Sequence, residues 1–165
     1  MVPQPTLPGS FQLSSIFYTM KLFAIAGVLG LATPVFSYTK TYTLSYDTKY
    51  DDGQNSLKDV ACSNGEYGLL TRGYTTFDAI PAFPNIGGAP QIQGANSYCG
   101  SCWELTYTDT SGVSTSLNFT AIDACTSSSD AFTISLEGMD YLTQGQGTKL
   151  KSVPITVARK TACGL

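Results

Sequence analysis

The sequence predicts a mainly β domain with short helices, a small β-barrel stapled by disulfides, and three observations support that fold class. Apolar and polar residues alternate over several short segments, as they do in strands with one buried face. Gly, Ser, Thr and Tyr are abundant and only 13% of residues are charged, which favours β structure. Five cysteines follow a segment with secretory character, and an oxidising compartment favours disulfides.

A short apolar run near the start of the chain is typical of a secretory signal peptide. Lys21 provides a positive charge before the apolar stretch 22–31, and Val35 and Ser37 are small enough to precede a cleavage site. The run is too short for a comfortable transmembrane helix. We therefore expect a signal peptide at 20–37.

The rest of the chain divides into residues 1–19 and residues 38–165. The first segment holds three prolines and no charged side chain, and we interpret it as a gene-model extension or an unstructured leader. The second contains no internal repeat and no linker, and its length suits one domain with its own core.

Charge and composition argue against several classes of function. The formal net charge is -3 and no cluster of Lys and Arg occurs, so the chain lacks an electrostatic surface for nucleic acid or anionic membranes. The sequence contains no histidine, which removes the usual base for a serine or cysteine nucleophile and the commonest metal ligand. We expect no metal, no cofactor, no nucleic-acid partner and no stable membrane insertion.

Alternating segments predict the strands of the domain. In the first segment Tyr42, Leu44 and Tyr46 share one face, and the polar residues between them share the other. A turn at 109–112 joins two further segments into a hairpin. The expected strands span 41–46, 103–107, 113–121, 132–134 and 153–157.

Two short helices and a loop are predicted between the strands. The segment 75–78 has a capping-box pattern, and Ser135 is a candidate cap for a second helix. Two prolines and two adjacent glycines in 81–88 predict a fixed loop. Pro154 indicates that the last strand lies at an edge or carries a bulge. The second helix buries apolar residues at helical spacing, namely Leu136, Met139 and Leu142.

The cysteines have an odd count, so one thiol is left over or pairs between molecules. Cys99 and Cys102 form a Cys-x-x-Cys pattern, which can lower a thiol pKa in redox proteins. That motif normally begins a helix, whereas Trp103 begins a predicted strand. We therefore favour two neighbouring cysteines that bond to different distant segments. Zinc binding is disfavoured because no second such pair occurs.

Seven motifs occur in order along residues 38–165. They are Leu44 to Asp47, Ala61 to Gly65, Phe83 to Gly88, Cys99 to Trp103, Ile122-Asp123, Met139 to Leu142, and Cys163. In this order and at these spacings the motifs resemble the cerato-platanin family of small secreted fungal proteins. No single motif would be specific.

The resemblance implies a six-stranded double-psi β-barrel related to the expansin N-terminal domain, barwin and family 45 glycoside hydrolases. It implies the disulfides Cys62–Cys99 and Cys102–Cys163 and leaves Cys125 as a free thiol. A bridge from Cys125 to one of the other four cysteines is the alternative.

The resemblance also implies a function outside the cell or in the fungal cell wall. Members of the family bind N-acetylglucosamine oligomers, loosen cellulosic material without detectable lysis and elicit plant defence, and some self-assemble. The implied partners are a cell-wall oligosaccharide, a plant-surface receptor and further copies of the chain.

Related hydrolases need two carboxylates placed across the sugar ring. The resemblance places Asp123 in the groove, but Thr133 occupies the position of the second acid. Asp130 is adjacent and is the alternative acid if the alignment shifts. We expect a non-catalytic binder. A weak or relict polysaccharide hydrolase and a surface-active coat protein are the alternatives.

A shallow sugar-binding groove needs planar hydrogen-bonding groups and aromatic faces. The candidate ligand-binding residues are Asp123, Asn85, Asn96, Arg72 and Tyr46. Each has an ordinary structural alternative. The two asparagines can satisfy their own loops, the tyrosine can belong to the core, the arginine can be a solvated charge, and the aspartate can cap the loop after it.

Two further residues have predicted environments. Asn118 begins an Asn-x-Thr sequon and lies on the face opposite Leu117 and Phe119, so we expect it to be exposed as a glycosylation candidate. Trp103 follows a cysteine and opens a predicted strand, so we expect it in the core rather than as a platform for sugar.

Overall fold

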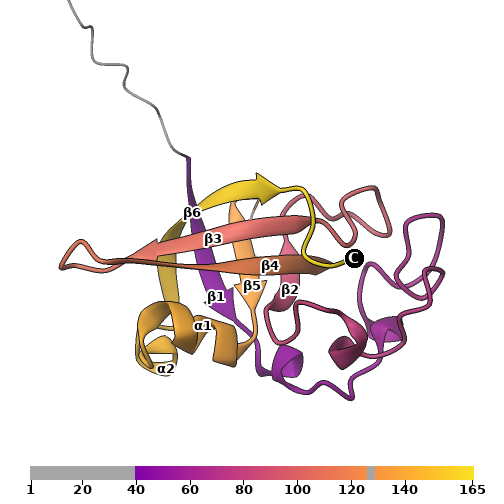
Figure 1. Cartoon of the computed structure of the whole chain (residues 1–165), viewed down its shortest axis with the longest axis horizontal. Coiled ribbons are helices and arrows are strands. Elements are labelled where there is room, and N and C mark those ends of the chain that lie inside the picture. Colours follow the sequence, from indigo (N-terminus) through magenta and orange to yellow (C-terminus); the bar gives the residue numbers. More distant parts are fainter. Residues whose placement is uncertain (1–39, 126–128) are drawn as a thin grey trace, which may run out of the picture. The chain divides into compact units, whose positions relative to one another are not determined.

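The computed structural model of the chain describes residues 40–125 and 129–165 (Figure 1). The expected signal peptide at 20–37 and the segment 1–19 lie outside these residues. Within the described ranges, no helix has the length and apolar character that crossing a membrane requires.

Six strands close into a barrel in the order β1-β5-β2-β4-β3-β6 (Figure 1). The pairs β1–β5 and β2–β4 are parallel, and the other four pairs are antiparallel. This closed barrel with short helices confirms the predicted fold class. The strands are β1 (Thr41–Tyr46), β2 (Ile86–Ala89), β3 (Cys102–Thr108), β4 (Ser114–Ala124), β5 (Ala131–Ile134) and β6 (Ser152–Lys160).

The helices are short and lie between the strands. Ser135 caps the first α-helix as expected, since its Oγ accepts a hydrogen bond from the Gly138 N–H at 3.0 Å. The Asp51 carboxylate accepts from the N–H groups of Leu136 and Glu137 at 2.9 and 2.8 Å. A segment far away in the sequence therefore completes the cap. The helices are α1 (Leu136–Thr143), α2 (Gly147–Leu150) and the 3₁₀ helices Thr48–Asp51, Leu57–Asp59 and Phe77–Ala79.

The capping-box prediction for 75–78 was wrong. Only the single 3₁₀ turn Phe77–Ala79 forms, and its N-cap residue Thr76 makes no side-chain cap bond. The N–H groups of Phe77 and Asp78 instead donate to backbone carbonyls of a neighbouring loop, each at 3.0 Å. Because tertiary backbone contacts satisfy these donors, no side-chain cap is needed.

The end of the predicted loop 81–88 is a strand. Ile86 to Ala89 form β2, which pairs with β4 on one side and β5 on the other. A Cβ at Gly87 would lie 2.0 Å from the Thr133 carbonyl oxygen, and a Cβ at Gly88 would lie 3.0 Å from that of Ala124. The paired glycines therefore allow β2 to fit closely between its neighbours.

At Pro154, β6 pairs with a neighbouring strand on one side only. In the register, Pro154 pairs with Thr43 of β1, whereas the pairing of β6 with β3 begins at Ile155. The edge position that Pro154 predicts is therefore limited to this end of β6. Further along the strand, β6 lies between β1 and β3.

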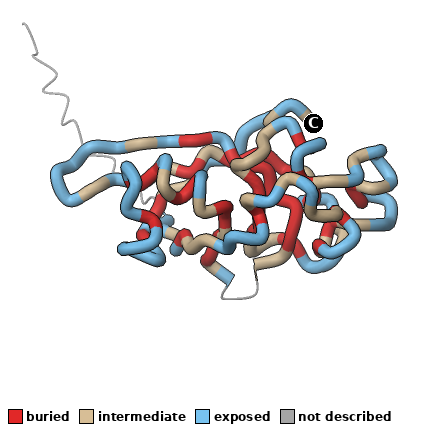
Figure 2. The backbone as a smooth tube through the Cα atoms, turned by 90° about the horizontal axis from the view of Figure 1, so that it is seen from below, coloured by how far each residue is buried: buried red, intermediate tan, exposed pale blue. Residues whose placement is uncertain are grey.

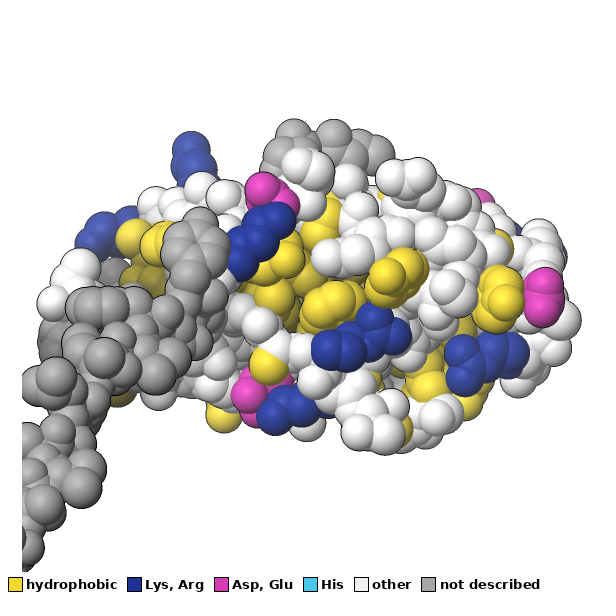
Figure 3. All heavy atoms as spheres, turned by 90° about the horizontal axis from the view of Figure 1, so that it is seen from above, with side chains coloured by type: hydrophobic (Ala, Val, Ile, Leu, Met, Phe, Trp, Pro, Cys, Tyr) yellow, Lys and Arg dark blue, Asp and Glu magenta, His cyan; other side chains and the backbone are white. Residues whose placement is uncertain are grey.

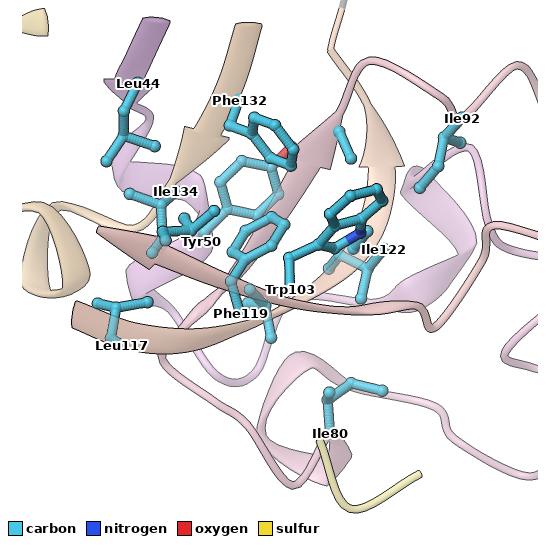
Figure 4. Packing of buried hydrophobic residues seen from close by; sticks show 14 of the residues in the cluster. Leu44, Tyr50, Ile80, Ile92, Trp103, Leu117, Phe119, Ile122, Phe132 and Ile134 are labelled. Atoms are coloured by element: carbon cyan, nitrogen blue, oxygen red, sulfur yellow. The ribbon is translucent and has the colours of Figure 1, made fainter. Parts of the chain in front are cut away.

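Aromatic side chains fill the barrel (Figure 4). The Phe132 ring meets Phe119 and Trp103 edge-on, with centroids 5.8 and 5.7 Å apart. Trp103 is 8% exposed and its Nε1–H donates to Ser101 Oγ at 2.8 Å. The expected core position of Trp103 is confirmed. Figure 2 shows the buried residues mostly toward the middle of the backbone tube and the exposed ones at its outer turns.

Two disulfides staple the loops to the barrel. Cys62 bonds to Cys99 and Cys102 bonds to Cys163, as the resemblance implied. The neighbouring cysteines of the Cys-x-x-Cys pattern therefore bond to different distant segments, which excludes a redox disulfide between them. Cys125 takes part in neither bond, and its Sγ lies 3.4 Å from Thr133 Oγ1.

Candidate functional site

The carboxylate of Asp123 is held by four hydrogen-bond donors near the end of β4. Its Oδ1 accepts from the backbone N–H groups of Ala61 and Ala124, each at 2.8 Å. Its Oδ2 accepts from the Tyr50 hydroxyl and the Lys49 ammonium, each at 3.0 Å. The Asp123 side chain is 13% exposed and that of Lys49 is 43% exposed, so the ion pair opens to solvent on the lysine side.

Tyr50 is the buried donor of this cluster. Burial raises the pKa of the Tyr50 hydroxyl far above its ordinary value of 10.0, and the charge of Asp123 raises it further. The phenol therefore keeps its proton and donates to Asp123 at physiological pH. The lysine ammonium also lies over the Tyr50 ring, 4.7 Å from its centroid.

A row of small and polar residues crosses the barrel from Asp123. The polar row consists of Asp123, Gly88, Thr133, Ser45 and Ser152, from β4, β2, β5, β1 and β6 in turn. Residues paired across neighbouring strands share a face of the sheet. Gly88 has no side chain, and the backbone of Ala124 and Cys125 lies 3.0 to 3.2 Å from the position that a Cβ there would take.

The hydroxyls of the polar row lie near one another. Thr133 Oγ1 is 3.4 Å from Ser45 Oγ. Both residues are half-buried, and Ser152 is exposed. Hydroxyls donate and accept, the carboxylate accepts, and the ammonium of Lys49 donates. This set of groups can bind a polyhydroxylated ligand by hydrogen bonds.

Asn85 and Asn96 lie apart from the polar row. Asn85 precedes Gly88 by three residues, which is about 10 Å along an extended strand. The Asn96 amide donates to the Gln91 carbonyl at 2.9 Å and accepts from the Tyr98 N–H at 3.1 Å. The side chain of Asn96 is thus engaged within its own loop, in agreement with the structural alternative.

Arg72 and Tyr46 have different surroundings. Arg72 is exposed, and its Nη1 lies 2.7 Å from the position that a Cβ at Gly100 would take, so the guanidinium covers that glycine. Tyr46 is half-buried and packs against the hydrophobic core at the end of β1. Neither side chain has a bond to Asp123 in the described structure.

Asp130, the alternative acid, takes part in other interactions. It forms an ion pair with Lys40, and its backbone carbonyl accepts from the Thr43 N–H at 2.9 Å. It precedes Thr133 by three residues, about 10 Å along the chain. Among the residues of the polar row, Asp123 is the one carboxylate. Within residues 40–125 and 129–165, no group of three or more Cys, Asp or Glu side chains is placed to hold a metal ion.

Cations cover several aromatic faces of the molecule. The Arg159 guanidinium lies 4.9 Å from the Trp103 ring centroid and 5.3 Å from that of Tyr98. Lys40 lies over Tyr42 in the same manner, at 4.9 Å. Figure 3 shows a face on which Lys and Arg side chains lie against hydrophobic ones. These covered rings offer less surface for stacking a sugar.

Asn118 is exposed on β4, as its place on the face opposite Leu117 and Phe119 predicts. Thr120 of the same sequon is fully buried, and its Oγ1 has no hydrogen-bond partner in the described structure. Glycosylation needs access to the whole sequon, so any transfer to Asn118 must precede closure of the barrel.

Sequence reasoning missed Lys49 and Tyr50 as partners of Asp123. These two neighbours lie 74 and 73 positions before Asp123, and neither lies in a chemical motif of its own. The signal that could have found them is the 3₁₀ turn after β1, where the N-cap Asp47 accepts from the Lys49 N–H at 2.9 Å and fixes that residue's position.

Comparisons with known proteins identify the family. The family model described as Cerato-platanin matches residues 42–165. The heat-stable 19 kDa antigen of Coccidioides immitis (strain RS) is 39% identical over 137 residues, which cover 81% of this chain and 86% of the antigen.

Two crystal structures from M. perniciosa are similar to the barrel. Cerato-platanin 2 is 34% identical with a TM-score of 0.70, covering 76% of this chain and 100% of that chain. Cerato-platanin 1 is 42% identical with a TM-score of 0.67, covering 72% of this chain and 94% of that chain. The family match over residues 42–165 and the similarity to these relatives show that this chain belongs to the cerato-platanin family.

Proposed function

We propose that this protein binds neutral cell-wall oligosaccharides without cleaving them, with N-acetylglucosamine oligomers as the first ligand to test. The chain is a cerato-platanin-type protein, and proteins of this family are small and secreted. The observation that carries the proposal is the polar row, in which a fixed carboxylate and three hydroxyl side chains follow one another across neighbouring strands of the closed barrel.

The polar row suits a saccharide for two reasons. Sugar hydroxyls donate and accept, and the Lys49 ammonium and the Thr133 and Ser45 hydroxyls supply both kinds of partner, while Asp123 holds the ammonium in place. Hydrogen bonds to charged groups are the stronger ones, and Asp123 is already held by Tyr50 and Ala61. A ligand therefore meets a preorganised surface and orders few side chains on binding.

The absence of a second acid in the row favours binding over hydrolysis. An inverting or retaining glycosidase needs two carboxyl groups at set distances. Thr133 faces Ser45 in the row, and a threonine hydroxyl is too weak an acid to protonate a glycosidic oxygen near neutral pH. Asp130 forms an ion pair with Lys40.

The proposal extends to the two roles that the family resemblance implies, loosening of wall polymers and elicitation of plant defence. Both roles require only that the protein occupy a polysaccharide surface or be recognised with its glycan. A relict hydrolase and a surface-active coat protein remain the competing proposals.

Titration of the secreted protein with N-acetylglucosamine tetramer tests the proposal. We expect backbone amide shifts at Ser45, Lys49 and Thr133 on addition of the tetramer. Thr133→Val removes a hydroxyl with little change in volume, and we expect it to weaken binding by about 1 kcal/mol, or roughly fivefold. Thr110→Val in the β3–β4 hairpin turn is the matched control. Unchanged affinity in Thr133→Val would overturn the assignment of the row.

An assay for reducing sugar tests the non-catalytic part. The purified protein should release none from chitin or cellulose, and Asp130→Asn should change nothing. Turnover that vanishes in Asp130→Asn would show that Asp130 is a catalytic acid and would support the hydrolase proposal.

A further inference from the structure

We propose that the protein has a second saccharide-binding site, centred on Tyr141, on a different part of the barrel from the polar row. A hollow of about 250 Å³ opens to solvent there. The inference deepens the proposed function, since both sites would take neutral sugar, but it rests on separate residues. The Tyr141 hollow is lined by Pro84, Asn85, Ser116, Leu117, Glu137 and Tyr141.

Three elements that pack together form the Tyr141 hollow. Pro84 and Asn85 lie in the loop before β2, Ser116 lies on β4, and Glu137 and Tyr141 lie on α1. Figure 1 shows α1 beside the strands, and α1 contacts β4 directly.

The backbone of Asn85 is held in place at the edge of the hollow. Its backbone carbonyl accepts from the Thr120 N–H at 3.0 Å, and its own N–H donates to Ala82 at 2.7 Å. A Cβ at Gly138 would lie 3.0 Å from Asn85 Oδ1, so the amide lies directly against the bare backbone of α1. The hollow is therefore preorganised.

Tyr141 is the exposed aromatic of this site. Its side chain is 62% exposed, the largest value among the large hydrophobic residues of the described ranges. Exposed aromatic residues beside a hollow are typical of binding surfaces, because a rigid ring offers a wide contact area at little entropic cost. The floor of the hollow includes Leu117, which is 7% exposed.

The polar lining selects the chemical class of ligand. A flat ring with an amide, a hydroxyl and a carboxylate beside it matches a pyranose, which has an apolar C–H face and equatorial hydroxyls. The carboxylate of Glu137 and that of Asp51, which accepts from the Glu137 N–H at 2.8 Å, both lie at the start of α1. Two acidic groups disfavour uronate or sulfated sugars, so the ligand is a neutral hexopyranose chain.

The Tyr141 hollow and the polar row lie at different ends of β2. Asn85 precedes the strand and Gly88 lies near its end, about 10 Å further along. Two separate sites allow one molecule to hold two polysaccharide segments, which raises avidity for a polymer over that for a short oligomer.

Amide NMR of the secreted protein tests the proposal with three tetrasaccharide probes. These are N-acetylglucosamine tetramer, cellotetraose and tetragalacturonate. We expect a neutral tetramer to shift the amides of Ser116, Leu117 and Glu137, and tetragalacturonate to leave them in place. Tyr141→Ala should weaken binding at these amides by about tenfold, whereas Tyr141→Phe should retain it because the ring remains.

Two further variants sharpen the test. Tyr67→Ala removes another exposed aromatic, 44% exposed and outside the lining of the hollow, and should leave binding unchanged. Glu137→Gln removes the repelling charge and should increase binding of tetragalacturonate.

The outcomes separate this inference from the proposed function. Shifts confined to the polar row overturn the second site and leave the proposed function standing. Shifts confined to the Tyr141 hollow support this inference and overturn the role of the polar row. No shift with either neutral tetramer overturns both. If the affinity measured from the Ser116 amide shift is unchanged in Tyr141→Ala, the second site is overturned.

Discussion

The carboxylate of Asp123 joins segments that are far apart in the chain. It bonds to Lys49, Tyr50 and Ala61, which lie 74, 73 and 62 positions away. It therefore fastens the turn after β1 and the first disulfide loop to the end of β4. This structural role exists whether or not the same carboxylate binds sugar, so the two roles need separate tests.

Asp123→Ala should destabilise the fold. The change leaves the Tyr50 hydroxyl and the Ala61 N–H without an acceptor and removes the partner of Lys49, and we expect a loss of about 3 kcal/mol in the free energy of unfolding. Urea denaturation measures it. Asp109→Ala is the control, since the Asp109 carboxylate accepts hydrogen bonds from Ser111 and Val113, within its own hairpin turn. A loss below that of the control would contradict the anchoring role.

Tyr50 should make stability depend on alkaline pH. Its pKa is raised in the fold above the ordinary value of 10.0, chiefly by burial and then by Asp123. The contribution of Tyr50 to the free energy of unfolding is therefore fully present below pH 10.0 and is lost as the pH rises. The reason is that the Tyr50 phenol ionises at a lower pH in the unfolded chain than in the folded one. The free energy of unfolding should fall more steeply above about pH 10 in the wild type than in Tyr50→Phe. Parallel pH profiles of the two proteins would contradict this coupling.

At the scale of elements, β2 shows how a segment rich in glycine becomes a strand. Gly87 and Gly88 carry no side chain to alternate, so the segment has no periodic signal. The strand forms because β4 and β5 supply partners on both sides. The helix α1 is the opposite case, since Ser135 and the apolar spacing predict it locally.

Gly87→Ala should disrupt the barrel. The added Cβ would meet the Thr133 carbonyl oxygen at 2.0 Å, a backbone group that cannot move without breaking the pairing of β2 with β5. We expect a loss of about 4 kcal/mol or more, seen as failed secretion or a large fall in Tm. Gly112→Ala has a positive φ of 86° and nothing within 4 Å of the added Cβ, and should cost only about 1 kcal/mol. Equal losses in the two variants would refute the close approach.

For the whole molecule, two disulfides supplement a small core. The bonds close loops of 37 and 61 positions, and each should contribute about 4 kcal/mol by restricting the unfolded chain. Replacing Cys102 and Cys163 by alanine should cost slightly more than replacing Cys62 and Cys99, because the longer loop loses more entropy. Thermal unfolding of the two double variants measures the difference. A much larger loss for the shorter loop would show that packing, and not loop entropy, governs their effect.

The functional surfaces also arise at the scale of the whole molecule. Each residue of the polar row comes from a different strand, and the Tyr141 hollow combines a loop, a strand and a helix. Asn85 was predicted from the sequence as a ligand-binding residue beside Asp123, but the fold places it at the Tyr141 hollow. The pairing of the strands determines which of the candidate ligand-binding residues lie close together in space.

The sequence by itself determined the features that depend on neighbours in the chain. Alternation predicted β1, β3, β4, β5 and β6, because side chains of a strand repeat with period two. The cap of α1 by Ser135 was predicted because Ser135 directly precedes three apolar residues spaced three apart, Leu136, Met139 and Leu142. The disulfide pairing came from the resemblance to a known family, since the count of cysteines alone left alternatives open.

Only the tertiary structure decided the features that join distant residues. These are the strand β2, the four donors to Asp123, the course of the polar row and the exposed Tyr141 beside its hollow. Each depends on barrel closure, which brings together groups more than 60 positions apart in the case of Asp123. Local patterns reflect the preferences of a few adjacent residues, whereas these contacts form only once the chain has paid the entropy of closing its long loops.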